Sequence, residues 1–318
     1  MPAIIGTSVE TARKLLAQGS LVAIPTETVY GLGGNALDAG VVAKIFEVKD
    51  RPFFDPLIVH VASFEQAKRY VKDIPLHAAS LASKFWPGPL TLLLPKEETI
   101  PDLVTAGSGR VALRCPAHAM TLQLLKELDF PLAAPSANPF NYVSPTTAKH
   151  VMDQLGEKIE YILDGGPCTV GIESTIIGWN DNQPVIHRLG AVPVESIESE
   201  IGPVRMVQQG GSTPEAPGQL LSHYAPRKRF LLGDIDQLIR EHGLRRPGVL
   251  RFQSHPITPA EVQKVLSPSG DLREAARNLF GMLRELDQEN VDAVVAEEVP
   301  DTGIGRAIND RLRRAAAR

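Results

Sequence analysis

Short apolar runs recur through the N-terminal part of the chain, and their ends carry hydroxyl, amide or cationic side chains. The first run, Leu21 to Ile24, leads directly into Pro25 and Thr26. Such runs, with helix-forming segments between them, predict buried strands of an α/β sheet. Because open α/β sheets bind ligands at the ends of their strands, the polar ends predict one shared ligand site.

The richest of these polar ends is the segment 25–33, which reads Pro-Thr-Glu-Thr-Val-Tyr-Gly-Leu-Gly. Glycine permits positive φ angles and close approach of a backbone to a ligand, so we expect an irregular loop here. A Thr-rich turn without function is the alternative that these residues alone leave open. The capping box of Thr7 and Glu10 predicts the helix that precedes this strand.

Two cationic residues, Lys49 and Arg51, lie just before Pro52. They follow a helix that is predicted to begin at Asp38. Since a proline disfavours helix at the residue before it, both side chains should project from a turn. This pattern suggests an anion clamp, and cations that only complement the helix dipole are the alternative. His60 lies in the apolar run 57–61, where a hydrogen-bonded core histidine is the alternative to a functional one.

Further polar residues lie at the ends of other predicted strands: Arg114, Ser136 and Asn138. Ser144 followed by Pro145 is typical of a helix N-cap and first position, and a helix N-terminus binds phosphate readily. Together these groups predict a cavity suited to a nucleotide and a small anionic substrate. The sequence has no P-loop, no dinucleotide fingerprint and no His/Cys cluster with metal-ligand spacing, so scattered side chains would hold the nucleotide.

The composition indicates which binding partners and which cellular compartment to expect for this protein. With 33 basic against 37 acidic residues, the net charge of −4 argues against a broad nucleic-acid-binding surface. The two cysteines, Cys115 and Cys168, form neither a zinc motif nor a disulfide framework, which favours a reducing compartment. No apolar run approaches the length of a membrane span and no signal-peptide core is present, so we expect a cytoplasmic protein.

Pro, Gly and Gln become frequent between residues 203 and 228, which is the composition of a linker. We therefore expect a catalytic domain at 1–202, a linker at 203–228 and a second domain at 229–318. Strand and helix segments alternate after Arg227 and predict a small parallel α/β domain. The linker residue Tyr224 suggests a lid over a nucleotide, and anchoring the linker to the second domain is the alternative.

Several motifs stand in a definite order: residues 25–33, Lys49-Asp50-Arg51-Pro52, residues 56–60, Pro87-Gly88-Pro89, Ser136-Ala137-Asn138, Ser144-Pro145-Thr146, Ser174-Thr175 and His223-Tyr224-Ala225-Pro226. Together they resemble the YrdC-like family and, end to end, the long two-domain form of the L-threonylcarbamoyladenylate synthases. The resemblance implies an α/β fold with an N-terminal YrdC-like twisted mixed sheet. A long linker would join it to a small C-terminal Rossmann-like α/β domain.

The resemblance also implies a reaction, in which L-threonine, bicarbonate or CO2, and ATP with Mg2+ give threonylcarbamoyl-AMP and pyrophosphate. A tRNA threonylcarbamoyl transferase complex would consume the product, so no stable nucleic-acid complex is expected. Lys49 and Arg51 would be the catalytic cations, and neither a protein metal ligand nor a covalent protein intermediate is expected. The residues implied for L-threonine are Thr28, His60, Arg114, Ala134 and Ser174. Those implied for ATP are Arg51, Asp55, Arg110, Ser136, Asn138, Ser144, Arg188 and Tyr224.

The chain departs from the family pattern at Asp55, where Asn is usual, at Phe140-Asn141, and in the linker before His223. A non-catalytic RNA-binding protein on the same fold is the alternative function. Its contacts to a phosphate backbone would come from Lys49, Arg51, Arg114 and Arg188. The low aromatic content of 5%, and cations that lie among Ser and Thr at strand ends, argue against that alternative.

Overall fold

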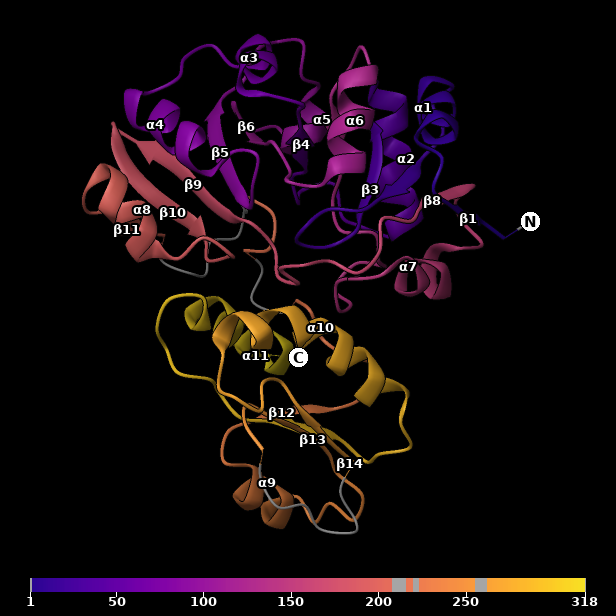
Figure 1. Cartoon of the computed structure of the whole chain (residues 1–318), viewed down its shortest axis with the longest axis vertical. Helices are drawn as coiled ribbons and strands as arrows, with labels where there is room; N and C mark the ends of the chain where they lie inside the picture. The colour runs from indigo at the N-terminus through magenta and orange to yellow at the C-terminus, as the bar shows by residue number, and fades with distance from the viewer. Residues whose placement is uncertain (1, 208–215, 220–222, 255–261, 318) are drawn as a thin grey trace. The chain divides into compact units, whose positions relative to one another are not determined.

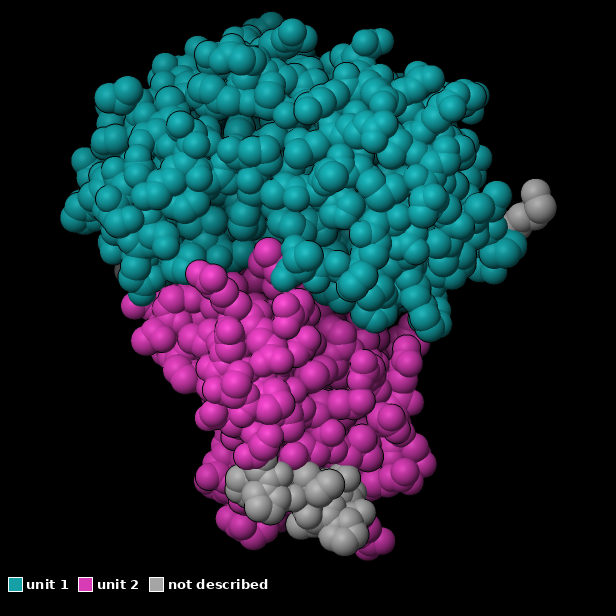
Figure 2. Space-filling model, viewed as in Figure 1, with its two compact units in different colours: residues 1–140, 145–169, 173–220 teal, residues 141–144, 170–172, 221–318 magenta. Residues whose placement is uncertain are grey.

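The computed structural model describes residues 2–207, 216–219, 223–254 and 262–317. The chain divides into two compact units, teal and magenta in Figure 2. The first comprises residues 1–140, 145–169 and 173–220, and the second comprises residues 141–144, 170–172 and 221–318. The predicted linker is thus divided between the units, and its residues 208–215 and 220–222 lie outside the described residues.

The first unit is built on an 11-stranded sheet in the order β1-β8-β2-β3-β7-β4-β6-β5-β9-β10-β11 (Figure 1). β4 pairs in parallel with β6, whereas β7 and β5 pair antiparallel with β4 and β6, respectively. The sheet is therefore mixed, as predicted. The strands are β1 (Ile4–Gly6), β2 (Val22–Ile24), β3 (Gly31–Asn35), β4 (Ile58–His60), β5 (Leu90–Pro95), β6 (Arg110–Arg114), β7 (Leu132–Ala133), β8 (Tyr161–Leu163), β9 (Thr175–Asn180), β10 (Gln183–Arg188) and β11 (Arg205–Met206).

Helices of the first unit begin at polar caps where the sequence supplies them. Asp38 caps α2 as predicted, but α1 is capped by Ser8 and not by Thr7, because the Ser8 side chain accepts from the Thr11 N–H. The helices are α1 (Val9–Ala17), α2 (Ala39–Lys49), α3 (Phe64–Ala67), α4 (Leu76–Phe85), α5 (Asp102–Thr105), α6 (Ala119–Glu127), α7 (Ala148–Leu155) and α8 (Val194–Ile201), with a 3-10 turn at Lys68–Tyr70.

Residues Gly31–Asn35 form strand β3, so the predicted irregular loop is wrong for this part of the segment. β3 pairs antiparallel with β2 and β7, and none of its glycines has a positive φ. Glycine is required here by close packing instead. A Cβ atom on Gly34 would lie 2.8 Å from side-chain carbons of both Leu21 and Val41.

The predicted helix start at Ser144 is also wrong. Helix α7 begins at Ala148, and the Thr147 side chain caps it. The carbonyl of Pro145 accepts from the backbone N–H of Tyr30 at 2.8 Å, so it is used in a long-range contact and not in a first helical turn. Ser144 therefore does not supply a helix N-terminus for phosphate.

The second unit is a small α/β domain with a parallel sheet, as predicted. Its strands lie in the order β12-β15-β13-β14, and Asp234 and Asp271 cap α9 and α10. Its elements are β12 (Phe230–Leu232), α9 (Ile235–Glu241), β13 (Gly248–Arg251), β14 (Val262–Val265), α10 (Leu272–Gln288), β15 (Val294–Ala296) and α11 (Gly305–Ala316). In the described parts of both units, no helix is long and apolar enough to cross a membrane.

Candidate active site

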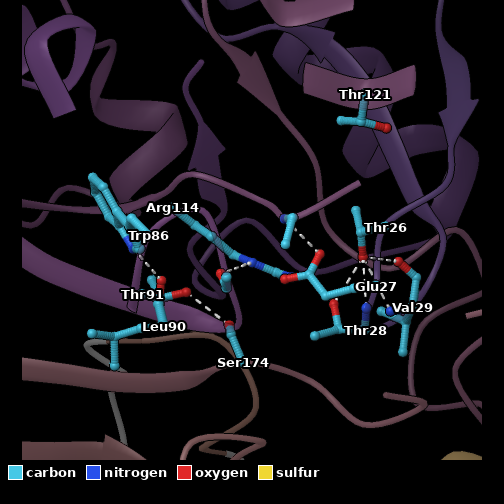
Figure 3. A network of polar contacts seen from close by, with 12 residues as sticks. Thr26, Glu27, Thr28, Val29, Trp86, Leu90, Thr91, Arg114, Thr121 and Ser174 are labelled. Carbon is cyan, nitrogen blue, oxygen red and sulfur yellow. Dashed lines mark hydrogen bonds and ion pairs between the residues drawn. The ribbon is translucent and has the colours of Figure 1, made fainter. Parts of the chain in front are cut away.

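Glu27 and Arg114 form a buried ion pair at the end of β6 (Figure 3), where they are 6% and 4% exposed. Glu27 Oε1 accepts from Arg114 Nη2 at 2.7 Å, and Oε2 accepts from the Ala117 N–H at 3.0 Å. Arg114 Nε donates to the Gly88 carbonyl at 3.3 Å. Within the described part of the chain, no hydrogen bond involves Arg114 Nη1. The guanidinium is therefore oriented from two sides, and one nitrogen can donate to a ligand.

His60 lies beside Arg114, because β4 and β6 pair in parallel with these two residues in register. On the other side of β4, the Ala134 N–H donates to the Ile58 carbonyl at 3.0 Å. The His60 ring is 3% exposed, and no described residue bonds Nδ1. Burial and, to a lesser extent, the Arg114 charge lower the pKa of His60 to about 3. The imidazole is therefore neutral, and Nδ1 can bond a ligand next to the guanidinium.

Two pairs of buried hydroxyl groups lie in the same network (Figure 3). Thr26 Oγ1 is 2.8 Å from Thr28 Oγ1 and donates to the Val29 carbonyl at 2.6 Å. Ser174 Oγ is 2.7 Å from Thr91 Oγ1. These groups can donate to or accept from a polar ligand, so the site combines a cation, a neutral imidazole and hydroxyls.

Arg188 holds Ser174 from the strand β10. Its Nε and Nη2 donate to the Ser174 carbonyl at 3.1 and 2.9 Å, and Nη2 also donates to Ser174 Oγ at 3.0 Å. Its Nη1 donates to the Pro217 carbonyl at 3.2 Å. A residue predicted for ATP thus contacts a residue predicted for L-threonine.

Lys49 is the last residue of α2, so the prediction that it projects from a turn is wrong, and it is 1% exposed. Its Nζ donates to the carbonyl oxygens of Ser136 and Asn138, and its own carbonyl accepts from the Phe140 N–H at 2.8 Å. Burial, aided by the charge of Arg51, lowers the pKa of Lys49 well below its usual range. Lys49 therefore fixes the backbone of residues 136–140.

Arg51 and Asp55 form a second buried ion pair, with Nη2 and Oδ2 2.9 Å apart. Arg51 also donates from Nε to the Asp55 carbonyl at 3.1 Å and from Nη2 to the Pro56 carbonyl at 2.7 Å. Burial raises the pKa of Asp55, and the nearby charges of Arg51, Lys49 and Arg188 oppose that rise. One carboxylate thus lies among three cationic side chains, a charge balance that suits an anionic ligand.

Arg110 and Arg114 occupy opposite ends of β6. At about 3.3 Å per residue, they lie roughly 13 Å apart. Arg110 Nη1 donates to the Trp179 carbonyl at 3.3 Å and to Asn180 Oδ1 at 2.9 Å. The structure therefore places Arg110 at the end of β6 away from Arg114 and His60.

Ser144 and Tyr224 belong to the second unit. The Ser144 carbonyl accepts from Arg284 Nε at 3.2 Å. The Tyr224 ring stacks on Phe280 with centroids 5.7 Å apart, and the Arg311 guanidinium lies 5.0 Å from the same ring centroid. These contacts agree with the anchoring role that the sequence left open for Tyr224.

Sequence reasoning assigned no role to Glu27 or Thr91. Glu27 is the carboxylate within the polar segment 25–33, and Thr91 is the one hydroxyl residue in the apolar run 90–94. A polar residue flanked by buried apolar ones is the signal that was available, because buried polar groups need partners.

Comparison with known proteins identifies the family. The profile described as Telomere recombination, of the Sua5, YciO and YrdC proteins, matches residues 14–190. The chain belongs to this Sua5/YrdC family. A second profile, described as Threonylcarbamoyl-AMP synthase, C-terminal domain, matches residues 192–317, so the family match extends over both units.

Two relatives that match this chain over nearly its whole length carry the same name. The threonylcarbamoyl-AMP synthase of Pyrococcus abyssi is 42% identical, over 97% of this chain and 94% of the relative. That of Bacillus subtilis is 41% identical, over 96% and 92%. A crystal structure of P. abyssi Sua5 complexed with L-threonine is 42% identical and covers 99% of this chain and 98% of the other, with a TM-score of 0.93.

Proposed function

We propose that this chain forms threonylcarbamoyl-AMP and pyrophosphate from L-threonine, bicarbonate or CO2, and ATP, and that it is a nucleotidyltransferase. One observation carries the proposal. An oriented, buried guanidinium with an available nitrogen lies beside neutral His60, in a chain that is 42% identical to a threonylcarbamoyl-AMP synthase over nearly the full length of both. No comparison favours the alternative of a non-catalytic RNA-binding protein.

The threonine carboxylate would accept from Arg114 Nη1 in a charge-assisted hydrogen bond. Thr28, His60 and Ser174 would bond the polar groups of the amino acid, since their side chains gather around the ion pair. The Ala134 N–H is already bonded to Ile58, so the carbonyl is the group of this backbone unit that remains for a ligand.

On the ATP side, Arg51 and Arg188 would stabilise negative charge on the phosphates. Lys49 would act through the segment 136–140, which it holds and which carries Ser136 and Asn138. The attacking group is a carbamate oxygen of the substrate, so the residues contribute by positioning and by electrostatics.

Mg2+ would arrive with ATP and supply further neutralisation of phosphate charge. In the ranges that the structure describes, no three His, Cys, Asp or Glu side chains gather where they could hold a metal ion, and Asp55 is already paired with Arg51. Phosphate oxygens and water would therefore hold the ion. The product would pass to a tRNA threonylcarbamoyl transferase complex.

The reaction can be tested directly. Pyrophosphate should be released from ATP only when threonine and bicarbonate are both present, and mass spectrometry should detect threonylcarbamoyl-AMP. Arg51→Ala should chiefly weaken ATP use and Arg114→Ala should chiefly raise the threonine requirement, each by about ten- to a hundredfold, because a hydrogen bond to a charged group contributes about 1.5–3 kcal/mol. Equal pyrophosphate release without threonine would contradict the assignment, and tRNA binding without any product would favour the RNA-binding alternative.

A further inference from the structure

Glu27 Oε1 lies 2.7 Å from Arg114 Nη2, so the negative charge of Glu27 offsets the positive charge of Arg114. Three further titratable groups near this pair, the His60 imidazole and two thiols, are uncharged at neutral pH. Burial lowers the pKa of His60 to about 3, and burial raises the pKa of the thiols of Cys115 and Cys168 to about 11 and about 12. The guanidinium that would receive a carboxylate is therefore part of a locally neutral pair.

The two oxygens of Glu27 already accept hydrogen bonds, one from Arg114 and one from Ala117. The Glu27 charge can also act on a ligand that Glu27 does not contact directly. A carboxylate bound at Arg114 Nη1 lies close to Nη2, which Glu27 holds. In an α-amino acid the nitrogen is two bonds from the carboxylate carbon. An ammonium group at that position is therefore close enough to interact electrostatically with the Glu27 carboxylate.

We propose that Glu27 is a specificity-determining residue, which makes this pocket select a zwitterionic α-amino acid over a carboxylate without the amino group. An anion without the amino group is attracted by Arg114 and repelled by Glu27. A zwitterion places one charge near each partner and gains from both. The inference rests on the proposed function, in which L-threonine is the ligand.

Calorimetric titration of three ligands tests the proposal: L-threonine, 3-hydroxybutyrate, which is threonine without its amino group, and L-threoninamide, a cation without the carboxylate. The full-length protein should prefer threonine to 3-hydroxybutyrate. Glu27→Gln should reduce that preference by at least about tenfold, because it leaves Arg114 without its counter-charge. Glu160→Gln removes an exposed carboxylate that is bonded to Ser20 and serves as the matched control, so its preference should equal that of the unmodified protein.

An unchanged preference in Glu27→Gln would overturn the proposal, even if both affinities fell together, because a residue that only supports Arg114 would weaken both ligands alike. If Glu27→Gln does not fold, the unmodified protein decides the question. If Glu27 offsets Arg114, the protein should bind 3-hydroxybutyrate no more than about tenfold more tightly than L-threoninamide, and a stronger preference for the anion would overturn the proposal. Failure of the unmodified protein to bind threonine would overturn the proposed function as well.

Discussion

Arg51 Nη2 lies 2.9 Å from Asp55 Oδ2, and both side chains are buried. Asp55 thus offsets part of the positive charge at the place where the ATP phosphates are proposed to bind. The family resemblance led us to expect Asn at this position, so the ion pair is a property of this chain that mutation can test.

Asp55→Asn should tighten ATP binding and lower stability. Removing the negative charge takes away its repulsion of the phosphates, so the Kd for ATP should fall at least about threefold. Loss of one partner of a buried ion pair costs about 3–5 kcal/mol, so the urea midpoint should fall too. Calorimetry and urea unfolding measure the two effects. Weaker ATP binding would show instead that Asp55 is needed to orient Arg51.

His60→Gln should reduce the loss of stability in acid. The pKa of His60 is about 3 in the folded protein and about 6.5 in an unfolded chain. Between these values the unfolded chain binds one more proton, so His60 makes stability fall by about 1.4 kcal/mol per pH unit below pH 6.5. Above about pH 6.5 this loss is absent. Urea unfolding at about pH 6.5 and about pH 4.5 checks the slope. Equal slopes in the two proteins would contradict a neutral, buried His60.

Lys49→Met should loosen the segment 136–140 and weaken ATP binding, because Nζ holds two carbonyls of that segment. Hydrogen exchange of the amides in this segment should speed up by at least about tenfold. Lys44→Met is a control on the same helix, since Lys44 Nζ donates to the carbonyl of Gly19 at an exposed position. Unaltered exchange in Lys49→Met would indicate that this side chain does not fix the segment.

Tyr224→Phe and Tyr224→Ala separate an anchor from a lid. Phe keeps the ring that stacks on Phe280 and faces Arg311, so its thermal midpoint should fall less than that of Tyr224→Ala. Ala should lose about 3–5 kcal/mol, as is usual for truncating a buried aromatic side chain. The two variants should also be assayed for product. If Tyr224→Phe keeps its stability but loses most product, the hydroxyl acts on the ligand, as the lid hypothesis requires.

The polar strand ends could be predicted from the sequence, because apolar runs mark buried strands and the residues that end each run can be identified directly. His60 and Arg114 are the clearest case, because both were assigned to one ligand and the parallel register of β4 and β6 places them side by side. Alternating strand and helix segments likewise predicted the second, parallel sheet, whereas the mixed sheet was predicted from the family resemblance.

Contacts between distant segments could not be predicted. Glu27 and Arg114 are 87 positions apart, and their pairing depends on strand order, which a single sequence does not reveal. The same limit explains the errors at Ser144 and at Gly31–Asn35. In both places a long-range partner, Tyr30 for Pro145 and β7 for β3, outweighs the local preference for a cap or a turn.

The proposed ATP site depends in part on Gly34, a residue that has no side chain. Val41, which any Cβ there would meet at 2.8 Å, belongs to the helix whose last residue is Lys49. Even a methyl group at position 34 would force the side chains of Leu21 and Val41 to shift, and Val41 lies on the same helix as Lys49, whose Nζ binds two carbonyls. The missing side chain at position 34 therefore leaves the space in which Leu21 and a residue of α2 pack, and the last residue of that helix holds a segment proposed to receive ATP.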